Sequence, residues 1–192
     1  LIEEEKMKDH QESFFYKLGS ISAWLQLLIT LAIIVISLTL GTEPKTAQEY
    51  FSLYQNDRLT GFLRDDFSSL IVVALYLGLF PGLYLALRQV NRHAAGFITA
   101  LVWVAVTCCF ANHSGFSLIH LSDQYAAAQD PAQKSQLLAA AEGVIAGNIW
   151  HSTGGYMTGI LLQGGGVLIS LLMLRSRHFS KVSAFAGLFA NA

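Results

Sequence analysis

Four stretches of the chain are apolar, contain no Asp, Glu, Lys or Arg, and alternate with segments in which the charged residues gather. They cover residues 18–42, 67–87, 94–122 and 143–174. A helix needs roughly 20 apolar residues to cross a hydrocarbon core of ~30 Å, and lipid offers the backbone no hydrogen-bond partners. The pattern therefore predicts an all-α fold, a polytopic transmembrane helix bundle with at least four complete spans.

The two ends of the chain differ from these stretches. Residues 1–17 form an acidic and aromatic tail, whereas the segment from about residue 182 to 192 is apolar but only about half as long as a crossing requires. We expect the tail to be cytoplasmic and the last segment to be the truncated start of a fifth span. The transmembrane helical domain then covers residues 18–192.

Composition supports a membrane location. Hydrophobic residues make up 53% of the chain and charged residues only 13%, and the mean hydropathy is +0.46. A soluble domain of 192 residues would have more apolar surface than it could bury, so the lipid bilayer is the expected partner. The chain has no surface rich enough in Lys and Arg to indicate nucleic acid binding.

The basic residues beside the spans predict an orientation. The short connections at 88–93 and 175–181 are basic, whereas the two longer connections mix charge signs or lean acidic. Because basic connections stay on the cytoplasmic side, the N-terminus is expected inside, in the bacterial inner membrane. Residues 43–66 and 123–142 then lie on the outer face.

Both outer connections are long enough to contain helices. In the segment near 46–64, aromatic and aliphatic residues are interspersed with polar ones, which predicts an amphipathic segment at the level of the headgroups. In the second connection, Asp130 and Pro131 form a helix-start signal, with Gln133 placed three residues after the cap. An amphipathic helix is therefore expected at about 131–142.

Small residues four positions apart indicate close packing between membrane helices. Such pairs are Gly78 with Gly82, Gly143 with Gly147, and Gly155 with Gly159, of which the first and last are the predicted packing residues. These faces would suit contacts with other membrane protein subunits. The alternative interpretation is that glycine is simply frequent in membrane helices.

Three histidines are the residues that most suggest chemistry. On a continuous helix His113 and His120 share one face, and His151 near the start of the fourth stretch lies on the same predicted side. Imidazole binds haem iron and transition metals, so a haem, metal or small-ligand site is one interpretation. The other is that these histidines, with Trp103, Tyr125 and Trp150, are interfacial or hydrogen-bonded packing residues. No metal-binding motif accompanies them, and no catalytic residue is assigned.

Several spaced segments resemble one bacterial multi-pass membrane family of unknown function, DUF4386. They are LALRQVNR at 85–92, LSDQYAAA at 121–128, PAQKSQLLAAAE at 131–142, LISLLMLRS at 168–176 and FSK at 179–181. The resemblance implies a bacterial cytoplasmic membrane, an α-helical bundle and a further span at the C-terminal end. It supplies no activity and no site residues.

These observations order the hypotheses about function. The first is a non-catalytic accessory or scaffolding subunit of a membrane assembly. The alternative is a haem-, metal- or small-ligand-binding membrane protein that uses His113, His120 and His151. A small transporter is less favoured, because the spans contain neither a charged residue nor a visible inverted repeat.

Overall fold

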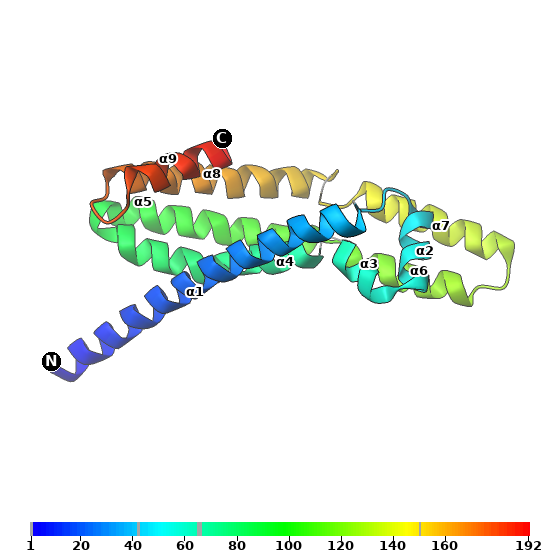
Figure 1. Cartoon of the computed structure of the whole chain (residues 1–192), viewed down its shortest axis with the longest axis horizontal. Coiled ribbons are helices and arrows are strands. Elements are labelled where there is room, and N and C mark those ends of the chain that lie inside the picture. Colours follow the sequence, from blue (N-terminus) through cyan, green and yellow to red (C-terminus); the bar gives the residue numbers. More distant parts are fainter. Residues whose placement is uncertain (1, 42, 65–66, 150) are drawn as a thin grey trace. The chain divides into compact units, whose positions relative to one another are not determined.

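The computed structural model describes residues 2–41, 43–64, 67–149 and 151–192 (Figure 1). Thr42 at the end of the first predicted span, the predicted interfacial residue Trp150, and Leu1, Asp65 and Asp66 lie outside the described residues. Helices are the only regular elements in the described part of the chain, which confirms the all-α class. Its helices are α1 (Ile2–Leu40), α2 (Ala47–Asn56), α3 (Arg58–Arg64), α4 (Phe67–Ala74), α5 (Tyr76–Asn112), α6 (Gly115–Ala127), α7 (Pro131–Ala146), α8 (Thr153–Arg175) and α9 (Lys181–Asn191).

Three helical stretches are long and apolar enough to cross a membrane. They are His10–Leu40, Phe67–Ala127 and Thr153–Arg175, so the chain has the character of a membrane protein. The middle stretch has 61 residues, which as one straight helix would extend roughly 90 Å, about three times the bilayer core. It must fold back on itself, and the number of crossings, four or more, stays a prediction.

The reversal lies inside α5. Asn91 has an extended backbone (φ −159°, ψ 102°) that separates two helical halves. Its side-chain oxygen accepts a hydrogen bond from the backbone nitrogen of Ala94 at 3.0 Å, as a residue that caps the start of a helix does. This position falls within the connection predicted at 88–93.

The chain forms two compact units. Unit 1 contains Leu1–Leu27, Val73–Thr107 and Met157–Ala192; unit 2 contains Leu28–Val72 and Cys108–Tyr156. The core of unit 1 consists of apolar side chains from both halves of α5 and from α8, and the two halves of α5 lie side by side in Figure 1. Its buried members are Phe80, Leu87, Ala95, Ile98, Val102, Val106, Ile169 and Leu172.

Small residues bring two further helices of unit 1 onto this core. A Cβ atom added at Gly82 of α5 would lie 3.1 Å from the Cα atom of Gly19 in α1, so these two backbones are close to contact. A Cβ at Gly187 of α9 would overlap the Ser170 hydroxyl of α8. Close backbone approach through small residues is a common way for membrane helices to associate.

Unit 2 has its own core beneath the predicted outer segments. Tyr50, Phe51 and Tyr54 of α2 are buried together with Leu118 and Ile119 of α6 and Ala141 of α7. The α2 aromatic residues that the sequence placed at the headgroups thus pack mainly against protein. Glu142 of α7 accepts a hydrogen bond from the backbone nitrogen of Ala47 at 2.8 Å, which fastens the start of α2 to α7.

The third predicted span is not one helix. α5 ends at Asn112 and α6 begins at Gly115, so the continuous helix expected over 94–122 is wrong. The break lies where Asn and Ser side chains compete with the helix for backbone groups. Asn112 donates a hydrogen bond to the Cys108 carbonyl at 2.8 Å and accepts one from the Ser152 hydroxyl at 3.3 Å. The apolar pattern over residues 94–122 does not reveal this break.

The fourth predicted span also begins later than expected. α7 starts at Pro131 with Asp130 as its N-cap, as predicted, but it continues to Ala146, and α8 starts only at Thr153. Gly147 ends α7, and the Asn148 carbonyl then accepts hydrogen bonds from the backbone nitrogens of His151 and Ser152 at 3.1 and 2.9 Å. A single apolar stretch over 143–174 therefore contains the end of one helix, a turn and the start of another.

Candidate functional site

The three predicted histidines are not gathered into one site. Within the described ranges, no three His, Cys, Asp or Glu side chains converge as metal ligands would. The shared face of His113 and His120 required a continuous helix, and the break between α5 and α6 removes that geometry. Each histidine has its own partner instead.

His113 has a local role at the break. Its Nδ1 accepts a hydrogen bond from the backbone nitrogen of Gly115 at 3.2 Å, at the first residue of α6. Its ring centroid lies 5.0 Å from that of Phe67, and its buried Nε2 forms no hydrogen bond with the residues that the structure describes. These contacts fit a packing and capping residue.

His120 is exposed on α6. Its Nε2 lies 3.0 Å from the side-chain nitrogen of Gln124, one turn further along the same helix. The pair is a surface hydrogen bond within one helix.

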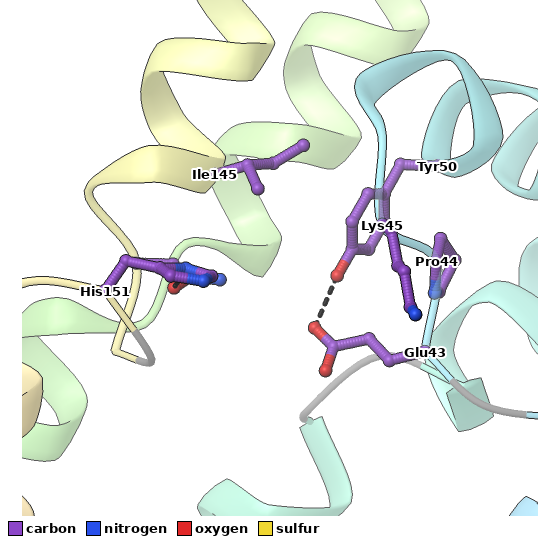
Figure 2. Close-up of a pocket in the computed structure, with 7 residues that line it drawn as sticks. Glu43, Pro44, Lys45, Tyr50, Ile145 and His151 are labelled. Carbon is purple, nitrogen blue, oxygen red and sulfur yellow. Dashed lines mark hydrogen bonds between the residues drawn. The ribbon is translucent and has the colours of Figure 1, made fainter.

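His151 borders a cavity. The cavity has a volume of about 430 Å³ and lies within unit 2 (Figure 2). We call it the Glu43–His151 cavity. It is lined by Glu43, Pro44, Lys45 and Tyr50 on one side and by Ile145, Asn148 and His151 on the other. Its size is within the range of about 300–1,000 Å³ that is usual for small-molecule sites.

Two hydrogen bonds order the polar side chains of this cavity. The buried Tyr50 hydroxyl donates to a carboxylate oxygen of Glu43. The Nδ1 atom of His151 lies 3.0 Å from the Asn148 side-chain oxygen, so Nδ1 is the donor and carries the proton. The Nε2 atom of a neutral His151 then has a free lone pair. Figure 2 shows the His151 ring directed toward Glu43 and Tyr50 across the cavity.

Local structure explains why these residues stand where they do. α1 ends at Leu40, and Gly41 adopts a positive φ of 87°, the left-handed conformation that commonly ends a helix at glycine. The chain then turns through Glu43 and Pro44, and Thr46 caps α2 by accepting a hydrogen bond from the Glu49 backbone nitrogen. The opposite wall is the turn between α7 and α8.

The four predicted packing glycines have different surroundings. Gly78 and Gly82 both lie against α1, where added Cβ atoms would meet Ser22 and Gly19. A Cβ at Gly155 would overlap the backbone of Ile149, in the turn before its own helix. A Cβ at Gly159 would meet nothing within 4 Å. The first pair therefore contacts a helix of the same chain, and Gly159 makes no close contact.

Sequence reasoning missed most of the cavity. Glu43, Lys45 and Asn148 were not singled out, because each looks like an ordinary polar residue beside an apolar stretch. The available signal was positional, since a charged pair directly after one span and a polar turn directly before another lie at the same membrane boundary. Comparison with known proteins adds no assignment: no protein family, curated protein or solved structure matches the chain.

Proposed function

We propose that this protein is a multi-pass protein of the bacterial cytoplasmic membrane, with its N-terminus inside, that serves as a non-catalytic accessory or scaffolding subunit. Its membrane character rests on three long apolar helices. The location, orientation and role are the proposal.

The orientation is supported by the arrangement of unit 1. Arg88 of the first basic connection forms an ion pair of 2.6 Å with Glu12 of the N-terminal region. Phe179 of the second basic connection lines the same hollow as Tyr16 and Ala86. Both basic connections and the beginning of α1 therefore lie at one end of unit 1. A common basic end is what the positive-inside rule expects of a cytoplasmic side.

The observation that carries the scaffolding role is the bare surface of α1. Of the most apolar 18-residue segment of each candidate span, 6% is buried in α1, against 33% and 28% in the other two spans. Large apolar side chains are exposed over most of its surface, and five of them follow a spacing of four and three residues: Trp24, Leu28, Leu31, Val35 and Leu38. This spacing is that of a helix seam which packs against another helix. The face of α5 that contains Gly78 and Gly82 is already covered by α1 of the same chain. The exposed surface of α1 is therefore the one that we assign to a partner.

Site-specific photo-crosslinking in intact membranes tests this proposal. A photoreactive residue is placed at Leu31 or Val35, on the exposed side of α1, and at Ile33, which is less exposed, as the matched control. A partner helix seated on the seam would give one discrete protein adduct from the first two positions and much less from the third.

The lipid alternative has a different signature. If lipid alone covers α1, all exposed positions give lipid adducts and no discrete protein product, which would refute the scaffolding role. Equal protein adducts from Leu31, Val35 and Ile33 would also count against it, because random collisions have no preferred face.

The ligand-binding alternative is favoured by one observation, the Glu43–His151 cavity. It now rests on His151 with new neighbours, since His113 and His120 do not line that cavity. An absorption spectrum and a metal analysis of protein purified in mild detergent test the haem and metal forms of this alternative. A Soret band or stoichiometric metal that disappears in His151→Ala would favour it over the scaffolding role.

A further inference from the structure

The Glu43–His151 cavity lies beside the ends of two candidate membrane spans. Glu43 comes three residues after the end of α1, and His151 comes two residues before the start of α8. Such short connections reach at most about 10 Å, so both side chains stay close to the ends of apolar helices. In a membrane this places the cavity near the lipid headgroups.

The side chains that line the cavity include hydrogen-bond acceptors, which suit a bound ammonium group, and one positively charged side chain. Glu43 supplies a carboxylate, which accepts from Tyr50 and, with about four acceptor positions, from further donors, and in its uncharged form His151 supplies the lone pair of Nε2. Lys45, which also lines the cavity, is exposed and carries a positive charge. A ligand that suits this set has an ammonium group with N–H donors and a neighbouring anion.

We propose that the Glu43–His151 cavity binds the phosphoethanolamine headgroup of a membrane lipid. The ammonium group lies between Glu43 and His151, and the phosphate pairs with Lys45, a common point-charge partner of phosphate. The acyl chains follow the exposed apolar end of α1, where Val35 and Leu38 are 58% and 82% exposed. The proposal rests on membrane residence and is independent of the scaffolding role.

Phosphocholine is the informative comparison, because it has the same phosphate and the same charges. Its quaternary ammonium has three methyl groups in place of N–H donors, so it can donate nothing to Glu43 or His151. A ligand that loses one hydrogen bond to a charged group binds about tenfold more weakly or worse. The expected preference is therefore for phosphatidylethanolamine over phosphatidylcholine by at least about tenfold.

Native mass spectrometry of the delipidated full chain in mild detergent measures this preference. Dioleoyl-phosphatidylethanolamine and dioleoyl-phosphatidylcholine are titrated separately, and each affinity is obtained from the bound fraction. Glu43→Gln removes the charge but keeps a side-chain oxygen, so the hydrogen bond from the Tyr50 hydroxyl to residue 43 is retained. We expect this variant to lose most of the preference, about tenfold.

Two variants separate the parts of the site. Lys45→Ala, at an exposed residue, should weaken the binding of both lipids without changing the ratio of their affinities, because both contain the phosphate. His151→Ala should lower the ratio, whereas His120→Ala should not, because His120 lies on the surface of α6 with Gln124. The melting temperature of each variant shows whether it is folded.

Three results would overturn the assignment. The first is equal affinity of the wild-type protein for the two lipids. The second is a preference that survives in both Glu43→Gln and His151→Ala. The third comes from soluble O-phosphoethanolamine: if it binds while the dioleoyl lipid does not, the ligand is a free metabolite and the lipid assignment fails.

Discussion

A side chain larger than hydrogen at position 82 is expected to push α1 away from α5. In unit 1 a Cβ atom at Gly82 would lie 3.1 Å from both the Gly19 Cα atom and the Phe15 carbonyl oxygen. Both neighbours are backbone atoms, so no side-chain rotation relieves the contact. The helix itself must move, and the variant Gly82→Leu tests this.

The expected magnitude comes from the cost of overpacking. Extra methylene groups forced into a well-packed contact cost about 1–3 kcal/mol. For chains of roughly this size each kcal/mol shifts the melting temperature by about 2–4 °C, so the expected decrease is about 2–12 °C. Gly82→Ala should have a smaller effect, because a gain of about 1 kcal/mol in helix propensity offsets part of the strain.

Gly159 provides the matched control. It is a glycine of α8 at which an added Cβ meets nothing within 4 Å. Gly159→Ala should leave stability unchanged or raise it slightly, and Gly159→Leu should cost less than Gly82→Leu. The assay is thermal unfolding in mild detergent, followed by helical circular dichroism. Equal melting temperatures for Gly82→Leu and Gly159→Leu would refute the close contact between α1 and α5.

Two further predictions concern unit 2. The pKa of Asp57 is lowered by hydrogen bonds from the Thr60 side chain (2.6 Å) and backbone (3.1 Å) and from the Leu59 backbone (3.0 Å). A lowered folded-state pKa means that the stabilisation of α3 is present above the unfolded pKa of about 3.9 and is lost as the pH falls through the folded value. Protection of the amides at the start of α3 against hydrogen exchange, relative to the intrinsic rate at each pH, should therefore fall in acid in the wild-type protein but be low at every pH in Asp57→Ala, and identical pH profiles of protection would contradict this cause. Phe51 is 1% exposed and lies 5.1 Å from the Tyr125 ring between centroids, so Phe51→Ala should destabilise unit 2 by about 3–5 kcal/mol. Leu59→Ala, at a 69% exposed position, should change stability by less than about 0.5 kcal/mol, and proteolysis of the connection at 43–64 should distinguish the two variants.

Local signals in the sequence were reliable where local physics decides the outcome. Asp130 and Pro131 predicted the start of α7 because an N-cap side chain and a preset backbone angle act within one turn. The aromatic residues in 46–64 predicted an amphipathic segment, yet their burial in a second core depended on α6 and α7, which are distant in the chain. The amphipathic pattern does not reveal whether lipid or protein covers an apolar face.

Breaks inside apolar stretches were the main source of error. The residues at 112–115 and 147–152 read as parts of long spans because hydropathy averages over a window and gives polar caps and glycines little weight. In the structure, hydrogen bonds of Asn112, Asn148 and Ser152 hold these turns together. Once α5 ends at Asn112, the expected face of His113 and His120 no longer exists.

The sequence by itself determined that the protein is helical and suited to a membrane, because apolar length and backbone satisfaction are properties of each segment alone. Only the tertiary structure decided which glycines meet another helix, since Gly82 and Gly159 occur in similar local patterns but have different neighbours. Tertiary structure alone also brought Glu43 and His151 to one cavity from opposite parts of the sequence. Contacts of this kind depend on where helices end and how they pack, and a pattern of apolar and polar residues does not specify either.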